Sequence, residues 1–539
     1  MKTIQFAFIL TLLIASSLLA QPVVSPSGIV NSAGWRNQAQ PVSGIAQGSI
    51  FTIQGSGIGP AQMVQASAIP LTTNLGGSSV SVTVGGKSVD ALILMAVSFQ
   101  INAILPSSTP AGSGTITVSY GGQTSTAQPI QVVPSLFGIY TFNSAGFGQA
   151  IATNTDYKPN TIIHTFNPGD WVILWGTGLG PISGSDAIAP PIGDISSAPA
   201  VHVGSTTVVP QYWGRSGFPG LDQVNFQVPA GVQGCYVPVA VETPTGVSNV
   251  ATIAVSSSGQ TCSDSILGQD LVNKLAAGGK VDFGYIRLES WFSKSAFYSP
   301  TGESDFAYAS FSEFTPQTAG SAAYGVSQGY CIGGNGGGTL GYGDMSPSQL
   351  DAGTALTLVG QGTVSMANAY GPYYWFNAGT AAKFLWSDLR YTVSGAGGKN
   401  VGAFTSTDTT SIGVVAFSSG VTPGQTVPRS GDLTVRWTGA DPTLQNGQVT
   451  LQAISANSSE TVFGFVMCTV PASATSFTIP GWLLSLLPPS GTIQVGATAF
   501  PLGFLLVGQY NNPTTFQASG LDRGLFTDIF YSGVGVTFQ

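Results

Sequence analysis

The chain has 539 residues, of which 43% are hydrophobic and 7% charged, and its formal net charge is −8. This apolar content is too high for a disordered chain. With 15 lysines and arginines against 23 acidic residues, the chain also lacks the basic surface of a nucleic-acid binder. Its length exceeds what one hydrophobic core supports, so we expect several domains.

Residues 1–20 predict a secretory signal sequence. Lys2 precedes an apolar run that ends in small residues, and cleavage is expected after Ala20. The run is shorter than the ~20 residues of a membrane-spanning helix, and no later stretch is long and apolar enough to span. We therefore expect an exported chain, extracellular or at the cell surface, with no membrane span after signal cleavage.

A repeated motif organises the region that follows. The stretch QGSIFTIQGSGIGP (47–60) matches PGDWVILWGTGLGP (168–181), and FQINAILP (99–106) matches DQVNFQVP (222–229). Inside each copy, turn residues break alternating apolar runs about every 8–12 residues, which predicts an antiparallel sandwich. The sequence thus predicts two tandem domains, at residues 27–134 and 135–258.

The glycines at the end of each copy resemble a nucleotide-binding loop. Such a loop needs a helix that opens directly after its glycines, whereas Pro60 and Pro181 follow at once and no amphipathic helix pattern comes next. We expect the glycines to turn the chain where a strand leaves its sheet. In the same way, VGGKS (84–88) lacks the first glycine of a P-loop and predicts a hairpin around Gly85–Gly86.

The GSGIGP and GTGLGP turns, paired with the QIN and QVN blocks, resemble the IPT/TIG branch of immunoglobulin-like domains. In particular, they are similar to a tandem module of secreted acidobacterial (Solibacter-type) proteins. The resemblance covers roughly residues 27–258 and implies Ig-like sandwiches used as spacers or binding modules, without a catalytic constellation. The first copy lacks cysteine and differs from the second within the QIN block, so the resemblance specifies no ligand.

The second half continues in strands and turns after one short helix, predicted at 264–279 and ended by Gly278–Gly279. The predicted fold class is therefore all-β: tandem Ig-like sandwiches, then further sandwich-type C-terminal domains, with one short linking helix. A proline- and glycine-rich hinge places a boundary near residue 425. It separates a β-rich domain, 263–425, to which the sequence assigns no topology, from a sandwich-like domain, 426–539.

Four cysteines, an even number, fit disulfides in an oxidising compartment. Of the three pairings they allow, we favour Cys235 with Cys262. Cys235 opens one strand and Cys262 follows another, and an antiparallel return would bring both to one edge within ~5.5 Å. The pair Cys331 and Cys468 follows by elimination, although it crosses the predicted boundary.

One motif points toward catalysis. GVSQG (325–329) fits the pattern around a hydrolase nucleophile, at Ser327. In that fold the histidine base follows the serine, whereas His164 and His202 both precede it, so we expect a glycine-rich turn and no catalytic residue. A carboxylate pair for glycoside hydrolysis would have to come from glutamates that the sequence does not bring together. The candidates are Glu289, Glu303 and Glu313.

The sequence contains only weak patterns of metal-binding residues. Two isolated histidines and scattered cysteines give no zinc spacing. Calcium is harder to exclude, because any aspartate or backbone carbonyl can supply its oxygen ligands. Asp344, Asp351 and Asp441 lie in turn-like stretches, but no DxDxDG loop exists. We predict no cofactor and leave calcium open.

The densest aromatic cluster is AYGPYYWFN (369–377). One interpretation is a buried strand. In the other, Tyr370, Tyr373 and Trp375 present flat rings with polar edges to a sugar or polymer, with Tyr373 and Trp375 on one face of a strand.

These features together predict an exported, non-catalytic protein that binds, adheres or acts as a spacer. Its candidate partner is an extracellular glycan or a surface protein, and nucleic acid is not expected. The alternative is a polysaccharide-directed enzyme whose Ig-like units are accessories.

Overall fold

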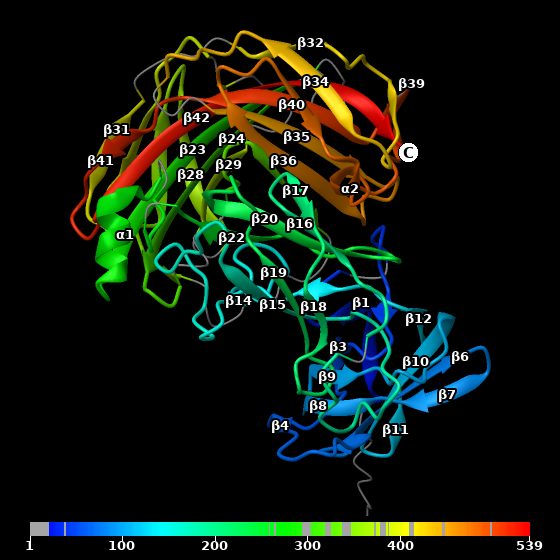
Figure 1. Cartoon of the computed structure of the whole chain (residues 1–539). Coiled ribbons are helices and arrows are strands. Elements are labelled where there is room, and N and C mark those ends of the chain that lie inside the picture. The colour runs from blue at the N-terminus through cyan, green and yellow to red at the C-terminus, as the bar shows by residue number, and fades with distance from the viewer. Residues whose placement is uncertain are drawn as a thin grey trace, which may run out of the picture.

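The computed structural model describes residues 21–539 except 37–38, 194, 258, 264–265, 294–302, 319–324, 337–346, 371–372, 378–383, 386, 409–413, 445–447 and 496–497. The predicted signal sequence lies outside the described residues. Within them, strands dominate and the two helices are α1 (Gly268–Ala276) and α2 (Gly481–Leu484). Figure 1 shows two small β-units below a broad, curved sheet, so the fold is all-β as expected.

The first unit is a sandwich of two sheets. Its strands are β1 (Val23–Asn31), β2 (Ile45–Ala46), β3 (Ile50–Ser56), β4 (Val64–Gln65), β5 (Asn74–Leu75), β6 (Ser78–Val84), β7 (Lys87–Asp90), β8 (Leu92–Val97), β9 (Gln100–Ile104), β10 (Gly112–Tyr120), β11 (Gln123–Thr124) and β12 (Gln128–Val133). The sheet orders are β1-β3-β9-β8-β4 and β2-β12-β10-β6-β5, with β7 on β6 and β11 on β10. Gly85 and Gly86 have φ of 58° and 78°, as the tight turn between β6 and β7 requires, so the predicted hairpin is confirmed.

The second unit repeats this architecture with five strands in each of its two sheets. Its strands are β13 (Gly138–Ile139), β14 (Ala152–Thr153), β15 (Trp171–Thr177), β16 (Ala200–Val203), β17 (Thr206–Val208), β18 (Tyr212–Arg215), β19 (Asp222–Gln227), β20 (Gly234–Thr243), β21 (Gly246–Val247) and β22 (Ala251–Val255). One sheet has the order β13-β15-β19-β18, with β14 on β15. The other has the order β17-β16-β20-β21, with β22 on β20.

The two copies of the sequence repeat pair their strands in the same register. In the first unit, β3 pairs with β9 so that Ile50 lies opposite Ile104. In the second, β15 pairs with β19 so that Trp171 lies opposite Gln227, and these are the positions that the two motif alignments match. Each copy therefore sets the strand before the glycine turn beside the strand that carries the QxN block.

The glycine turns change the chain direction, as predicted. Gly57 and Gly178 have φ of 63° and 109°, a backbone conformation that favours glycine. A Cβ atom on Gly178 would lie 2.2 Å from the carbonyl oxygen of Leu136, so the turn also needs close backbone approach. No helix opens after either turn.

The described residues after the second unit form one 15-stranded sheet and two small sheets. The large sheet contains β23 (Val281–Ser293), β24 (Glu303–Phe314), β25 (Tyr330–Gly336), β26 (Ser348–Gln349), β27 (Ala355–Val359), β28 (Thr363–Tyr370), β29 (Tyr373–Asn377), β30 (Thr392–Gly395), β31 (Phe404–Thr407), β33 (Thr426–Val427), β35 (Gln448–Ala456), β36 (Phe463–Pro471), β40 (Gly503–Tyr510), β41 (Thr514–Phe516) and β42 (Arg523–Phe538). The small sheets contain β32 (Ala416–Ser419), β34 (Leu433–Thr438) and β37 (Ser476–Ile479), and β38 (Thr492–Val495) and β39 (Thr498–Pro501).

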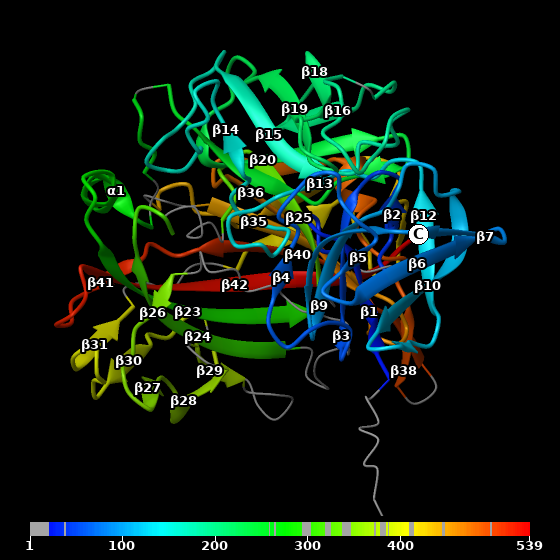
Figure 2. The same ribbon diagram turned by 90° about the horizontal axis from the view of Figure 1, so that it is seen from below.

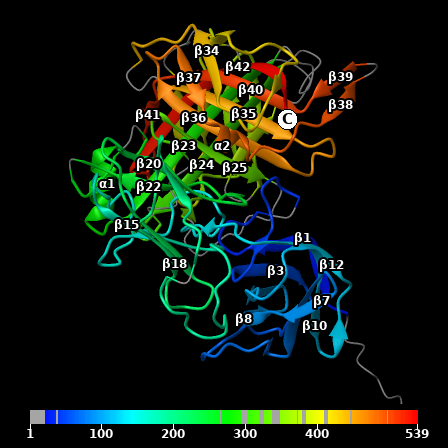
Figure 3. The same cartoon turned by 45° about the vertical axis from the view of Figure 1, so that its right-hand side comes forward.

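The main path of the large sheet is β25-β36-β35-β40-β42-β23-β24-β29-β28-β27-β30-β31. The final strand β42 lies between β23, to which it is parallel, and β40, to which it is antiparallel. In addition, β25 pairs with β36. A boundary near residue 425 does not divide this sheet, because β36, β35, β40 and β42, which follow that residue, lie between β25 and β23, which precede it. Figure 3 shows β42 and β40, from the end of the chain, in the same sheet as β23 and β24, which come soon after the second unit.

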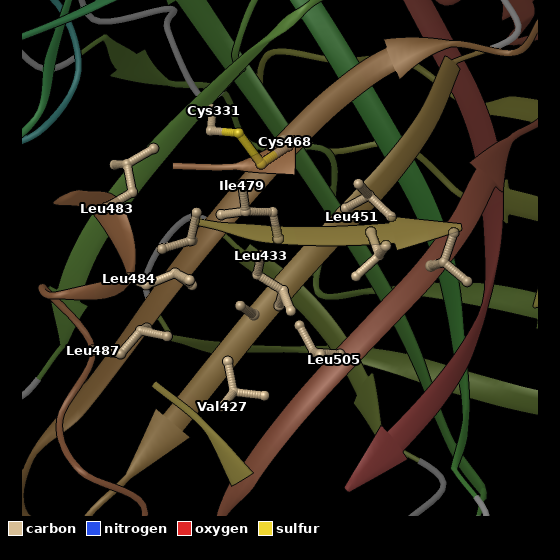
Figure 4. Packing of buried hydrophobic residues seen from close by; sticks show 14 of the residues in the cluster. Cys331, Val427, Leu433, Leu451, Cys468, Ile479, Leu483, Leu484, Leu487 and Leu505 are labelled. Atoms are coloured by element: carbon tan, nitrogen blue, oxygen red, sulfur yellow. A yellow bond between two sulfur atoms is a disulfide. The ribbon is translucent and has the colours of Figure 1, made fainter. Parts of the chain in front are cut away.

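One core of this half lies between the large sheet and the small sheet β32-β34-β37, as in a sandwich. Leu433, Val435 and Trp437 of β34 pack against Leu451 of β35 and Leu505 of β40. The Cys331–Cys468 disulfide joins directly opposed positions of β25 and β36 beside this core, as Figure 4 shows. The Cys235–Cys262 disulfide joins β20 to the segment before α1. Both pairs are those that the sequence favours.

Helix α1 is shorter than the predicted range. Gly278, with φ of 86°, follows its last turn and donates its N–H to the carbonyl of Leu275, a common way to end a helix. Leu271 and Leu275 pack against Tyr236 of the second unit and Phe283 of the large sheet. The helix thus links the second unit to the sheet.

Candidate functional site

A cavity of about 990 Å³ lies between the second unit and one face of the large sheet. In Figure 1 the sheet curves over β20 and β22 of that unit, and Figure 2, seen from below, shows β20 in front of strands of the sheet. Gln233, Tyr236 and the Cys235–Cys262 disulfide line the cavity from the side of the second unit, and Ser327 and Gln328 line it beside β25. We call the sheet face that lines the cavity the aromatic face.

Strand register builds the aromatic face. Tyr285 on β23 lies opposite Ser310 on β24, which lies opposite Tyr373 on β29. One row further on, Arg287 lies opposite Tyr308, which lies opposite Trp375. Because side chains alternate along a strand, these residues share one face of three neighbouring strands.

The intervening residues of the same strands form a hydrophobic core on the opposite face. They include Ile286, Leu288, Ala307, Ala309 and Tyr374, and all are buried. On the aromatic face, in contrast, Tyr285, Tyr308 and Tyr373 are partly exposed. The face therefore combines large rings with access to the cavity.

The rings lie against one another. Tyr308 stacks on Tyr373 with ring centroids 5.5 Å apart. Burial raises the pKa of Tyr308 and of Tyr285, so both phenols are protonated at neutral pH and can donate hydrogen bonds. Phe465 on β36 and Tyr510 at the end of β40 extend the lining to the other side of the cavity.

Arg287 is the one charged side chain among the described residues that line the cavity. Its Nη2 lies 3.0 Å from Oε2 of Glu289, and its guanidinium lies over the ring of Tyr308, 5.9 Å from the centroid. Burial is the largest influence on the Arg287 guanidinium and opposes its charge, but the Glu289 carboxylate and the neighbouring tyrosines together outweigh burial, so the pKa of Arg287 is raised. Glu289 also accepts a hydrogen bond from the indole N–H of Trp291. The arginine charge is thus balanced beside the cavity.

Neutral polar side chains supply the rest of the hydrogen-bonding capacity. Hydroxyl and amide groups line the cavity from at least five strands and from the neighbouring loops. They include Ser310, Ser312, Gln349, Gln448, Thr450, Thr469, Asn511 and Thr527. The cavity can therefore satisfy a ligand that carries many hydroxyl groups.

The three predicted binding residues differ in their position relative to the cavity. Tyr373 lines the cavity. Trp375 lies on the same face and contacts Tyr308 and Phe306, with centroids 6.5 and 5.7 Å apart. Tyr370 ends β28, and its side chain lies outside the described part of the chain.

Sequence analysis missed most of the aromatic face. The alternation in YIRLESW (285–291) places Tyr285, Arg287 and Trp291 on one face of a strand and could have identified them. Nothing local connects Phe465 or Tyr510 to that strand, because their positions follow from pairings across the whole second half.

Ser327 holds the second unit to the segment before β25. Its Oγ accepts a hydrogen bond from the N–H of Tyr236 at 2.9 Å, and its own N–H donates to the Tyr236 carbonyl at 3.1 Å. His202 is engaged elsewhere: its Nε2 lies 2.9 Å from Glu242 Oε2, and its ring stacks on Trp482, centroids 4.4 Å apart. His164 is exposed.

The two candidate glutamates whose side chains are described, Glu289 and Glu313, do not come together as a pair. Glu289 is bound to Arg287, whereas Glu313 pairs with Lys280 at 2.9 Å. Glu313 lies opposite Asp282, seven positions along β23 from Glu289, or ~23 Å at the rise of a strand. Catalytic carboxylates in glycosidases are about 5–9.5 Å apart. The side chain of Glu303 lies outside the described part of the chain.

Two of the calcium candidates cap their own turns. Asp351 accepts hydrogen bonds from the N–H groups of Gly353 and Lys399, and Asp441 accepts from the N–H and hydroxyl of Thr443. Asp344 lies outside the described residues. In the described ranges, no three His, Cys, Asp or Glu side chains gather as a metal site would require.

No helix among the described residues has the length and apolar character needed to cross a membrane.

No family model matches the chain, and no curated protein matches it. Solved structures that it resembles include Bacteroides ovatus SGBP-B of a mixed-linkage glucan utilization locus, in complex with a heptasaccharide. That protein is 12% identical over 40% of this chain with a TM-score of 0.19, and this chain spans 45% of its length. Domains 4–9 of the surface layer protein SbsC are 12% identical, over 96% of this chain and 65% of that one, with a TM-score of 0.18. Immunoglobulin domains 1–4 of Sidekick-1 are 10% identical, over 92% and 95%, with a TM-score of 0.13. At these scores the likenesses carry no argument about function.

Proposed function

We propose that this chain is an extracellular, non-catalytic binding protein that holds an uncharged glycan in the cavity between its second Ig-like unit and the large sheet. The observation that carries the proposal is the lining of the cavity, where tyrosine rings alternate with neutral hydrogen-bonding side chains and the one charged side chain is already paired.

Aromatic rings and neutral polar groups match the chemistry of sugars. A pyranose with equatorial hydroxyls exposes C–H groups on its faces, which pack on flat rings such as Tyr308 and Tyr373. Its rim of hydroxyls needs donors and acceptors, which the serine, threonine, asparagine and glutamine side chains of the cavity supply. The volume of about 990 Å³ lies at the upper end of small-ligand sites.

The charge balance favours an uncharged ligand over an acidic one. Arg287 would attract a carboxylate or sulfate, but Glu289 already lies 3.0 Å away on the same face. A second anion would meet Glu289 and a chain of net charge −8. A hydroxyl can accept from the Arg287 guanidinium without this repulsion.

The two disulfides support an extracellular location. Structural disulfides form and persist in oxidising compartments and are rare in the cytosol of most organisms. Each of the four cysteines is paired here, and the predicted signal sequence agrees with export.

The separation of the glutamates favours binding over hydrolysis. Glu289 and Glu313 are ~23 Å apart along adjacent strands, and Glu289 is held by Arg287 and Trp291. The alternative of a polysaccharide-directed enzyme therefore gains no support from these two residues.

A pulldown with insoluble polysaccharides tests the proposal. The chain from residue 21 onward is incubated with cellulose, xylan free of uronic acids and chitin, which are uncharged, and with calcium alginate, which is acidic. We expect retention on at least one uncharged polysaccharide, with affinity about tenfold lower in Tyr308→Ala. Trp171, which is 39% exposed on the second unit, provides the matched control, Trp171→Ala, with unchanged retention.

Three results would contradict the proposal. The first is no retention on any uncharged polysaccharide. The second is preferential retention on alginate that is lost as salt is raised. The third is release of reducing sugar from a soluble substrate by the purified chain, which would establish an enzyme.

A further inference from the structure

We propose that the binding site continues out of the cavity along three further rings, Trp375, Phe306 and Trp291, which hold additional sugar units of a glycan chain. We call these three rings the track. The inference rests on the proposed function, because it assigns the length of the ligand that the cavity holds.

The track is continuous with the cavity. Tyr308, which lines the cavity, contacts both Tyr373 inside it and Trp375 outside it, with centroids 5.5 and 6.5 Å apart. Phe306 then lies 5.7 Å from Trp375, and Trp291 lies 5.6 Å from Phe306. Each ring contacts the next, so no break separates the cavity from Trp291.

All three rings of the track are partly exposed. On the same strands, the residues that point to the other face, among them Leu288, Ala307 and Tyr374, are buried in the core. A run of large apolar rings that keeps access to solvent on a folded sheet is typical of a binding surface.

The track is held in place before any ligand arrives. The indole N–H of Trp291 donates to Glu289, and its ring meets Tyr531 edge to face, with centroids 6.4 Å apart and planes at 83°. Because Glu289 also holds Arg287, one carboxylate positions both the charged group of the cavity and the far ring of the track. A rigid surface loses less entropy when it binds.

The track has the length of a chain rather than of a single sugar. From Tyr285, in the cavity, to Trp291, the strand advances six positions, or ~20 Å at the rise of a strand. A monosaccharide in the cavity would leave the track empty. An oligosaccharide would cover both.

Chain-length dependence of binding tests this inference. Calorimetric titrations use cello-, xylo- and chito-oligosaccharides of two, four and six units with the wild type, Trp291→Ala, Phe306→Ala and Tyr308→Ala. For the series that binds, we expect wild-type affinity to rise with length. Trp291→Ala should bind the six-unit ligand about fivefold or more weakly and the two-unit ligand with unchanged affinity, whereas Tyr308→Ala should bind both ligands about tenfold more weakly.

The controls separate the track from folding. Trp291→Phe keeps a ring and should retain most of the length dependence, and Trp171→Ala should match the wild type. Should Trp291→Ala fail to fold, Phe306→Ala provides the same comparison. If Trp291→Ala lost affinity equally for short and long ligands, or lost none for long ones, the track would not be part of the binding site, whereas the proposal for the cavity would stand. No binding by any of the three series would overturn the proposed function itself.

Discussion

Arg215 and Asp222 form an ion pair whose side chains are both 0% exposed. Arg215 also donates to the carbonyl oxygens of Gly48, in the first unit, and Gly180, at 3.1 and 2.9 Å. Asp222 accepts from the N–H of Gly178 at 2.8 Å. The pair therefore joins the glycine turn of the second unit to the repeated motif of the first.

Arg215→Ala should destabilise the tandem units by about 3–5 kcal/mol, because it leaves Asp222 buried without its counter-charge. Replacing both partners, with Arg215→Met and Asp222→Leu, should cost far less, since no charge then remains buried. Urea unfolding followed by tryptophan fluorescence measures both. An Arg215→Ala variant as stable as the wild type would show that the ion pair contributes nothing to the free energy of unfolding.

Stability should depend on pH through Asp528 and Asp408. Burial raises the pKa of Asp528 to about 7, with Asp408 as the next cause, and burial raises the pKa of Asp408 to about 6. A hydrogen bond from Asn511 partly offsets the rise in pKa at Asp528, and the N–H of Tyr391, followed by the charge of Arg390, partly offsets it at Asp408. The folded state then holds protons that the unfolded chain, with a carboxyl pKa of ~3.9, has released.

The stability that these protons provide is present at acidic pH and is lost as the pH rises toward 7. One proton corresponds to a slope of about 1.4 kcal/mol per pH unit. Asp528→Asn should match the wild type near pH 4 and be more stable than it at pH 8, measured by urea unfolding at each pH. A wild type that gains stability between pH 5 and 8 relative to the variant would contradict the assignment.

Ser327→Ala should leave the rate of ester hydrolysis in the presence of the protein unchanged, because Ser327 is not expected to be a catalytic residue. The Ser327 hydroxyl is bound to the Tyr236 N–H, so its loss should lower stability by about 1 kcal/mol. Turnover of p-nitrophenyl acetate by the wild type and the variant, together with thermal unfolding, provides the check. An esterase activity that disappears in a folded Ser327→Ala variant would establish a catalytic serine.

Trp375→Ala should weaken glycan binding more than folding, because its ring lies on the partly exposed aromatic face. The adjacent Tyr374 provides a matched contrast: it is 1% exposed, and its hydroxyl donates to the Gly353 carbonyl. Tyr374→Ala should cost about 3–5 kcal/mol of stability. Comparison of melting temperature with retention on the bound polysaccharide tests both. A Trp375→Ala variant that binds normally but melts far earlier would assign this ring to the core.

The sequence by itself determined the parts of the fold that depend on neighbouring residues. The two glycine turns, the Gly85–Gly86 hairpin and the end of α1 follow from backbone conformations that favour glycine. The repeat predicted two units because each motif brings its own pair of strands, within about one domain length. The Cys235–Cys262 pair lies within reach of a single strand return.

Only the tertiary structure decided the large sheet and the site on it. Strand β42 sets Thr527 beside Arg287 across 240 positions of sequence, and β36 brings Phe465 to the same cavity. Alternating apolar residues mark a strand but carry no record of its partner, since strands of similar pattern can pair in many orders. The choice among those orders depends on side chains packing across the whole sheet. For that reason Tyr373 and Trp375 could be predicted as neighbours on one strand face, whereas the cavity that Tyr373 lines could not.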